Sequence, residues 1–278
     1  MNKLASILIL SMCCMVSCAC SSNSDGPEDV LPPLNDGERI VFQDDFDTFD
    51  ETVWNRETHN PGWTNGELQY YNPAHVSVGK DGEKTVLMLT AEHKDGKIIS
   101  GRINSKGNRS FKYGKIEASI KLPKTANGLW PAFWMMGETN EWPACGELDI
   151  MEMGDVTGIR TGTTAQRVNT AIHFGPNGKG HRQEYYAANA SGNLQDGKYH
   201  VYTAAWNEKE IQILIDGALF HTFNIYQNSY FHDNFFILFN LAVGGEFTGI
   251  DDKADITALK EGQKAVMYVD WVRVTDNK

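Results

Sequence analysis

Short apolar stretches separated by turn residues restrict the fold of this chain most strongly. Residues 85–91, 115–122 and 210–216 alternate apolar and polar side chains or run apolar over a strand's length. Glycine, asparagine and aspartate form turn signals between such stretches, at 80–82, 94–96, 176–178 and 216–217. Long amphipathic helical patterns are absent from the sequence, apart from a turn near 256–259. The pattern predicts an all-β protein with two packed sheets.

The N-terminus has the features of an exported lipoprotein. Lys3 precedes an apolar stretch at 4–16 that is too short to span a bilayer. The segment ending Ser17-Cys18 resembles a bacterial lipobox, in which the cysteine is acylated and becomes the mature N-terminus. Cys20 is the alternative anchor, and an ordinary cleaved signal peptide is the alternative to acylation. We expect a signal peptide at 1–20 and lipid anchoring through Cys18 at the bacterial outer membrane, on the cell surface.

The remaining chain divides into a spacer and one domain. Residues 21–37 are polar and contain proline and glycine, which is typical of a flexible linker. Residues 38–278 suit a single β-sandwich. Four of the five cysteines lie before residue 21, so Cys145 has no partner for an internal disulfide. The formal charge of −11 argues against nucleic acid and anionic surfaces as partners. We expect a monomer.

Three carboxylates lie close together in an otherwise apolar, strand-forming stretch: Glu147, Asp149 and Glu152. Residues two apart on a strand share a face, whereas Glu152 follows Glu147 by five and would point the other way. One extra residue, a β-bulge near Ile150 and Met151, would return all three to one face. Alternating acids on a strand usually indicate only a solvated face. Two glutamates on one face, however, are the chemical groups of a glycosidase.

Tryptophans surround this motif in the sequence. Trp130, Trp134 and Trp142 lie within twenty residues before Glu147, and aromatic side chains suit the apolar faces of sugar rings. We expect these three to bind substrate. We expect Trp54, Trp206 and Trp271 in the core, because they occur within strand-like apolar patterns; Trp63 stays undecided.

The segments GLWPAFWMMG at 128–137 and EWPACGELDIMEMG at 141–154 resemble glycoside hydrolase family 16, in its laminarinase-like branch with the bulged E-x-D-x-x-E motif. Further matches follow the family's order over roughly residues 38–275. They are FQDDFD at 42–47, NGELQYY at 65–71, SGRI at 100–103, YGKIEA at 113–118, AIHFG at 171–175, NLAVGG at 240–245 and YVDWVRV at 268–274.

This resemblance implies a β-jelly-roll sandwich with a concave substrate groove crossed by the carboxylate strand. It implies that Glu147 is the nucleophile and Glu152 the general acid/base of a retaining double displacement, with Asp149 between them. Strand geometry by itself does not distinguish retention from inversion.

The resemblance also implies further roles. Asn65, Arg102, His173 and Asn240 match positions that bind sugar hydroxyls or support the acids. Arg102 as a structural ion pair and His173 as a core histidine are the alternatives. Asp270 matches a position where members hold a structural calcium. We expect that catalysis requires no cofactor.

We therefore expect an endo-acting, retaining glycoside hydrolase that cleaves β-1,3- or mixed-linkage β-1,3/1,4-glucans, with the polysaccharide as its partner. One alternative is a galactan hydrolase of the same family, of the agarase or porphyranase type. The other is a glucan-binding protein without catalysis, although such proteins typically lack one of the carboxylates.

Overall fold

The computed structural model describes residues 34–177 and 180–277. The described residues from 36 onwards form one compact unit, whose first residue lies close to the predicted domain boundary at 38. The expected signal peptide, the Cys18 anchor and residues 21–33 of the expected linker lie outside the described residues, so these stay predictions. Within the described ranges, no helix is long and apolar enough to cross a membrane.

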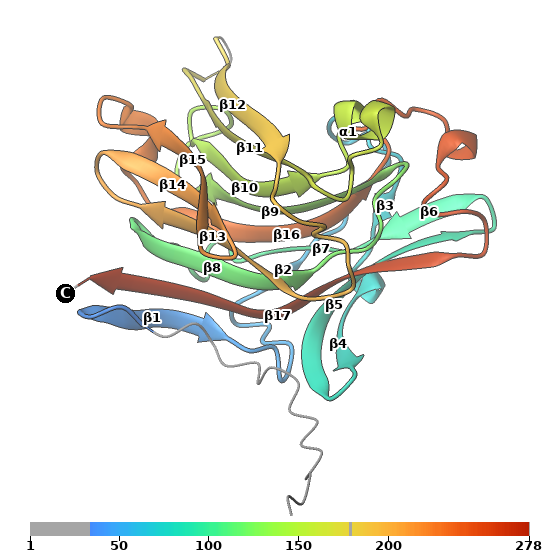
Figure 1. Cartoon of the computed structure of the whole chain (residues 1–278), viewed down its shortest axis with the longest axis horizontal. Coiled ribbons are helices and arrows are strands. Elements are labelled where there is room, and N and C mark those ends of the chain that lie inside the picture. Colours follow the sequence, from blue (N-terminus) through green and yellow to red (C-terminus); the bar gives the residue numbers. More distant parts are fainter. Residues whose placement is uncertain (1–33, 178–179, 278) are drawn as a thin grey trace, which may run out of the picture. The chain divides into compact units, whose positions relative to one another are not determined.

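The described chain is almost entirely β, as predicted, and its strands form two sheets (Figure 1). The larger sheet has ten strands. Its main order is β15 (Ala218–Asn224), β14 (Glu210–Ile215), β13 (His200–Trp206), β8 (Gly114–Lys121), β17 (Lys264–Asn277), β5 (Lys84–Lys94), β6 (Lys97–Ser100) and β3 (Tyr70–Tyr71). In addition, β1 (Glu38–Asp44) pairs with β17, and β4 (Val76–Asp81) pairs with β5. Strands distant in sequence are neighbours here, which is typical of a sandwich rather than a meander.

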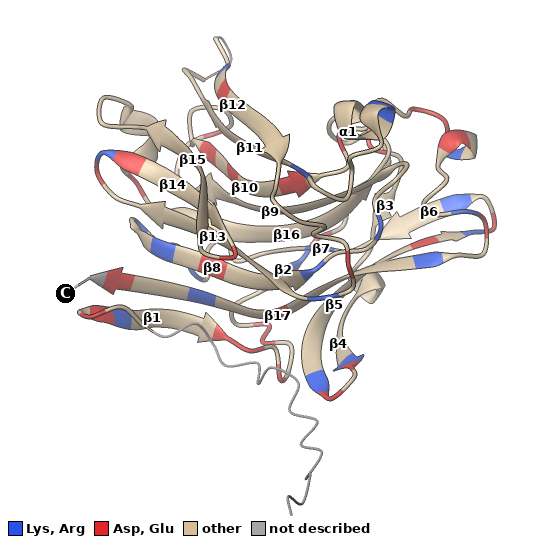
Figure 2. Cartoon of the chain, viewed as in Figure 1, with Lys and Arg blue, Asp and Glu red and all other residues tan. Residues whose placement is uncertain are grey.

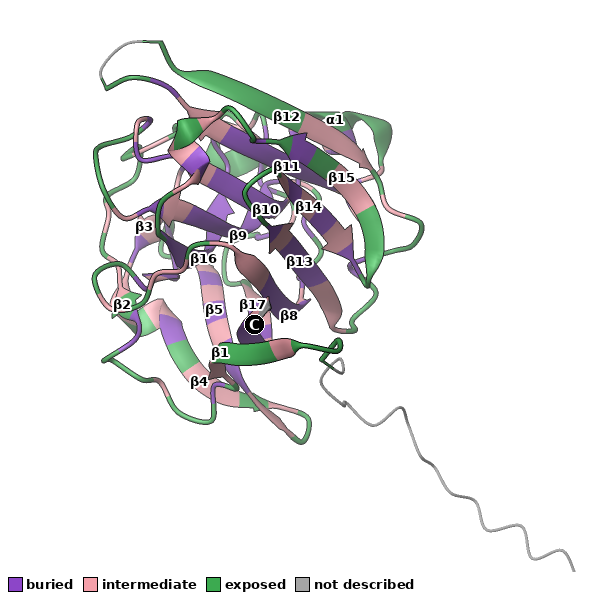
Figure 3. Ribbon diagram, turned by 90° about the vertical axis from the view of Figure 1, so that its left-hand side faces the viewer, coloured by how far each residue is buried: buried purple, intermediate pink, exposed green. Residues whose placement is uncertain are grey.

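The smaller sheet has seven strands and carries the carboxylate motif. Its order is β12 (Arg182–Asn189), β11 (Arg167–Phe174), β10 (Glu147–Met153), β9 (Leu129–Gly137), β16 (Phe235–Val243), β7 (Arg102–Asn104) and β2 (Asn55–Arg56). The carboxylate strand β10 therefore lies inside the sheet, between β9 and β11. Figure 3 shows that the central strands of this sheet are largely buried.

Helical segments are few and short in the part of the chain that the structure describes. They are α1 (Val156–Thr161) and the 3-10 turns η1 (Pro73–His75), η2 (Ser229–Phe231) and η3 (Lys253–Asp255). Asp155 caps α1 by accepting a hydrogen bond from the Gly158 amide at 2.9 Å, and Gly162 ends the helix in a left-handed conformation.

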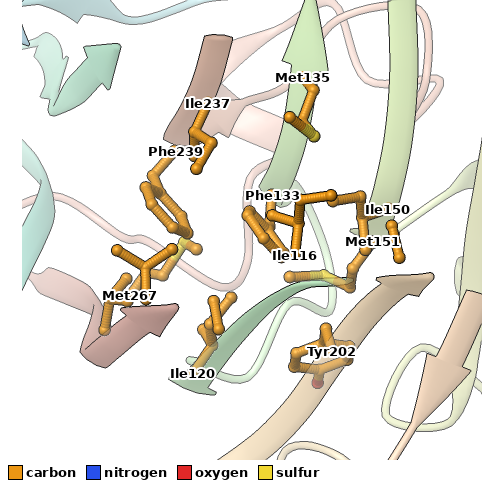
Figure 4. Packing of buried hydrophobic residues seen from close by; sticks show 14 of the residues in the cluster. Ile116, Ile120, Phe133, Met135, Ile150, Met151, Tyr202, Ile237, Phe239 and Met267 are labelled. Atoms are coloured by element: carbon orange, nitrogen blue, oxygen red, sulfur yellow. The ribbon is translucent and has the colours of Figure 1, made fainter. Parts of the chain in front are cut away.

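The core fills the space between the two sheets (Figure 4). Phe133 and Ile150 of the smaller sheet lie in one cluster with Ile116 and Tyr202 of the larger sheet. Met151 belongs to the same cluster, directly after Ile150. Two consecutive residues of a regular strand cannot both point into one core, because side chains alternate between faces. The backbone of β10 must therefore be irregular at this point.

Candidate active site

A β-bulge in β10 places the three carboxylates on one face of the smaller sheet. Asp149 pairs with Trp134 of β9 and Met151 pairs with Phe133, so the register shifts by one residue at Ile150. On the other side, Asp149 pairs with Ala171 of β11 and Glu152 with Asn169. The bulge lies where the sequence predicted it. The side chains of both residues at the bulge, Ile150 and Met151, enter the core, and Glu147, Asp149 and Glu152 line the same pocket. Figure 2 shows the acidic residues along β10.

The start of the carboxylate strand is held by a glycine. Gly146 has a φ of +79°, and a Cβ atom there would lie 2.6 Å from the Tyr230 carbonyl oxygen. Only glycine fits this conformation and this close approach of backbones. Gly146 thus permits η2 and the first residue of β10, Glu147, to pack together.

Each carboxylate has a different partner. The Trp130 indole Nε1 donates a hydrogen bond to Glu152 Oε1 at 2.8 Å. The Trp142 side chain hydrogen-bonds to Glu147. His173 Nε2 lies 3.1 Å from Asp149 Oδ2. Two of the predicted substrate-binding tryptophans therefore also orient the two glutamates.

Burial and mutual repulsion keep protons on this group. Burial and the charge of Asp149 raise the pKa of Glu147 to about 8, against the opposing effects of His173, Trp142 and Arg102. Burial raises the pKa of Asp149 to about 8. Burial, Asp149 and Glu147 raise the pKa of Glu152 well above its usual value. The acids lie close enough for their titrations to be coupled, and burial favours the protonated form of each.

The pocket over these acids has a volume of about 430 Å³. Its lining includes six of the seven residues that the sequence predicted for substrate binding: Asn65, Arg102, Trp130, Trp134, Trp142 and Asn240. Trp63, which the sequence left undecided, and Glu67 also line it. Concave sites with aromatic walls and a few placed polar groups are typical of ligand pockets.

Arg102 joins the polar and aromatic parts of one wall. Its Nε lies 3.0 Å from Glu57 Oε2, and its guanidinium lies 4.8 Å from the Trp134 ring centre and 5.2 Å from that of Trp63. The Trp63 ring is in turn stacked on His59, with ring centres 3.5 Å apart. The two alternatives for Arg102 are therefore compatible, because it is in a structural ion pair and also lines the pocket.

Asn240 holds a neighbouring aromatic side chain in place. Its Oδ1 accepts a hydrogen bond from Trp134 Nε1 at 2.7 Å, and its Nδ2 donates to Tyr71 Oη at 3.2 Å. Tyr71 in turn donates to Glu67 Oε2 at 3.0 Å. Burial raises the pKa of Glu67. Sequence reasoning missed Glu67 as a pocket residue, although its position two residues after Asn65 could have indicated it.

Trp130 and Trp134 are less exposed than the sequence suggested, at 8% and 9%, whereas Trp142 and Trp63 are 47% and 51% exposed. The Trp130 ring stacks on Phe247 with centres 4.5 Å apart, and Trp134 lies against Arg102. Each of these two rings thus has a neighbour over it. Trp54, Trp206 and Trp271 are buried, as predicted.

His173 is not among the residues that line the pocket; on the neighbouring strand β11 it pairs with Glu147 and lies beside Asp149. Its Nε2 contacts that carboxylate, and its Nδ1 lies 2.9 Å from His181 Nε2. His181 in turn contacts the Trp142 ring, with centres 4.7 Å apart. The prediction that His173 supports the acids agrees with this arrangement, and the partial exposure of its side chain does not fit the alternative of a core histidine. His181 had no signal in the sequence.

The predicted metal ligand lies elsewhere. Asp270 Oδ2 accepts from Lys84 Nζ at 2.6 Å, so an ammonium group already competes for this carboxylate. The contact favours a structural ion pair, and calcium at Asp270 stays a prediction. Among the residues that the structure describes, one group brings together three donors suited to a metal, namely Glu147, Asp149 and His173 within 4.8 Å. These are the candidate nucleophile, Glu147, and two of its neighbours.

Residues 63–272 match the model of glycosyl hydrolases family 16. Among solved structures, the chain is similar to a Bacteroides ovatus mixed linkage glucan GH16 in complex with a G4G4G3G product. The two are 64% identical with a TM-score of 0.84, covering 84% of this chain and 100% of that one. This neighbour and others in the family share the jelly-roll architecture of the two sheets.

Curated relatives show the same likeness. The chain is 32% identical to glucan endo-1,3-beta-glucosidase A1 of Niallia circulans, over 87% of this chain and 38% of the relative. It is 31% identical to the clotting factor G alpha subunit of Tachypleus tridentatus, over 85% of this chain and 34% of the relative. The chain therefore spans little more than a third of these two proteins.

Proposed function

The chain belongs to glycosyl hydrolases family 16, and on that premise we propose that it is an endo-acting, retaining hydrolase of mixed-linkage β-1,3/1,4-glucan. The observation that carries the proposal is the bulge that brings Glu147, Asp149 and Glu152 to the floor of one aromatic-walled pocket. The likeness to a structure described with a mixed linkage glucan product supports this substrate over a pure β-1,3-glucan.

The proposed mechanism assigns the two steps to the two glutamates. The Glu147 carboxylate attacks the anomeric carbon, and a bond forms between them while the glycosidic C–O bond breaks. Glu152 donates its proton to the departing oxygen. In the second step, Glu152 takes a proton from water, whose oxygen replaces Glu147 at the same carbon. The strongly raised pKa of Glu152 supports its role as the acid.

Asp149 and His173 have supporting roles in this proposal. Asp149 lies between the two glutamates on the same face, and its charge raises the pKa of both. His173 lies against Asp149 and opposes its effect: it lowers the pKa of Glu147 and Glu152 and so favours their ionised forms. Together, Asp149 and His173 determine at which pH each of the two glutamates ionises.

A panel of polymers tests the substrate. We expect the purified protein to cleave barley mixed-linkage glucan fastest and laminarin more slowly, and to leave agarose and porphyran intact. Proton NMR during cleavage should show the β-anomer forming first, because two displacements restore the configuration. Cleavage of galactans alone would contradict the substrate class. An initial α-anomer would contradict retention.

Two alternatives have less support. A galactan hydrolase would share the same carboxylates, and the panel distinguishes it. A glucan-binding protein without catalysis does not need three acids buried together, because like charges in one site destabilise one another. Keeping Glu147, Asp149 and Glu152 in one pocket is consistent with catalysis.

The pH dependence tests the role of Asp149. Its negative charge disfavours ionisation of both glutamates, so Asp149→Asn lowers the pKa of each. Glu147 then ionises, and Glu152 loses its proton, at lower pH. We expect both limbs of the kcat/KM profile to move to lower pH, with a reduced maximum. Asp251→Asn, at an exposed acid outside the pocket, serves as the control. Unchanged limbs in Asp149→Asn would show that its charge does not control the pair.

A further inference from the structure

A second cavity lies outside the pocket that contains the carboxylates. It has a volume of about 540 Å³ and is lined by Phe174 of β11, Arg182 and Glu184 of β12, and residues of the segment 224–230. It shares no lining residue with the carboxylate pocket. The volume is in the range of pockets that bind small molecules or a few sugar units.

The cavity opens on the other face of the smaller sheet. His173 points towards Asp149 on the pocket face, and the next residue, Phe174, points away from it. Phe174 contacts the rings of Tyr230 and Phe231, at 5.9 and 6.0 Å between centres. A ligand in this cavity would therefore not occupy the groove over Glu147.

Aromatic and amide side chains dominate the rim. Tyr226 is 64% exposed, the largest exposure of any large hydrophobic residue in the described ranges, and it lines the cavity beside Gln227 and Asn228. An exposed ring beside planar amides offers stacking and paired hydrogen bonds, which are the contacts that a pyranose requires. The carboxylate pocket combines the same types of side chain: tryptophans, asparagines, Arg102 and carboxylates.

An unpaired acceptor lies at the same place. Asn228 occupies the N-cap position of η2, but its side chain makes no capping hydrogen bond. Its Oδ1 is buried and has no hydrogen-bond partner among the described residues. A buried acceptor without a donor costs free energy, and a hydroxyl group entering the cavity would satisfy it.

The charges of the lining point to a neutral ligand. Arg182 and Glu184 are two residues apart on β12, both are exposed, and neither has an ion-pair partner among the described residues. One positive and one negative group give no net attraction for an anion or a cation. Both offer hydrogen bonds to hydroxyl groups.

We propose that this cavity, formed by Phe174, Arg182, Glu184 and the segment 224–230, is a second binding site for a neutral β-glucan chain. The identity of the ligand rests on the proposed function. A long polymer can occupy the cavity and the carboxylate pocket of one molecule or of neighbouring molecules, and each bound segment raises the effective concentration of the rest. The second site thus favours polymeric over short substrates.

Affinity electrophoresis tests the second site. The full chain with Glu147→Gln, which binds without cleaving, is run in gels containing barley mixed-linkage glucan. When Tyr226→Ala is combined with Glu147→Gln, we expect the retardation of the protein by the glucan to weaken roughly fivefold, as the loss of one aromatic contact does. Added Asn228→Ala should weaken it as well. Leu219→Ala, which removes a 61% exposed side chain outside the cavity, should leave it unchanged.

Kinetics with the active enzyme provides the second readout. Tyr226→Ala should keep its kcat/KM on a mixed-linkage tetrasaccharide and lose activity on the polymer. Equal retardation of Tyr226→Ala and Leu219→Ala in the β-glucan gel would overturn the second site. It would also be overturned if Tyr226→Ala reduced retardation in a gel containing porphyran and not in the β-glucan gel. By contrast, if the parent chain neither binds nor cleaves any β-glucan, the proposed function itself fails.

Discussion

Replacing either glutamate of the bulged strand should abolish hydrolysis. We expect Glu147→Gln and Glu152→Gln each to reduce kcat about 10³-fold or more on mixed-linkage glucan, since each removes the nucleophile or the proton donor and keeps the side-chain volume. Assays of reducing ends, with the wild-type chain in parallel, measure the loss. Activity within tenfold of wild type in either variant would contradict the assignment.

Azide distinguishes the two roles. With an activated aryl glucoside, azide should restore turnover to a Glu152 variant such as Glu152→Ala, because that leaving group needs no proton and azide needs no base. In a Glu147→Ala variant, azide should instead take the place of the nucleophile and give a product of inverted configuration. The opposite pattern of products would exchange the roles of Glu147 and Glu152.

Stability provides the control for misfolding. A carboxyl whose pKa is raised in the folded state is protonated more readily there than in the unfolded chain. Ionisation of Glu147 therefore destabilises the fold progressively as pH rises from its usual 4.5 towards about 8, and fully above that. Glutamine carries no charge, so Glu147→Gln should raise the Tm at pH 9 and change it little at pH 4. An inactive variant that is more stable cannot owe its inactivity to unfolding.

The carboxylate strand shows how far sequence alone can define a site. The spacing of Glu147, Asp149 and Glu152 conflicts with a regular strand, and the apolar Ile150 and Met151 between them indicate where the extra residue must go. The alternation of side chains along this strand was therefore enough to predict the bulge. Likewise, the short strands and turns between 85 and 217 predicted the all-β class without tertiary information.

Other parts of the site depend on contacts between distant segments. Trp63 lies in the pocket against Arg102. Glu67 accepts from Tyr71, which in turn accepts from Asn240, 169 residues further along the chain. The exposures of Trp130 and Trp134 depend on Phe247 and Arg102, which are far away in sequence. Periodicity within one strand carries no information about such neighbours.

The tryptophans should separate into two groups when each is replaced by alanine. Trp206 is 3% exposed and packs edge-on against Tyr113 and Phe235, with ring centres at 5.3 and 5.2 Å. Trp206→Ala should lower the free energy of unfolding by about 3–5 kcal/mol, which corresponds to a Tm lower by roughly 10 °C. Its remaining folded fraction should cleave long and short substrates in the wild-type ratio.

Trp142 should behave in the opposite way, because 47% of its side chain is exposed and it hydrogen-bonds to Glu147 at the pocket. We expect Trp142→Ala to shift the Tm by less than Trp206→Ala and to reduce kcat/KM. The reduction should depend on oligosaccharide length, since a substrate too short to reach the ring cannot lose that contact. Thermal melts and kinetics on a ladder of oligosaccharides measure both effects. A length-independent loss with a large fall in Tm would show that Trp142 supports the fold and not the sugar.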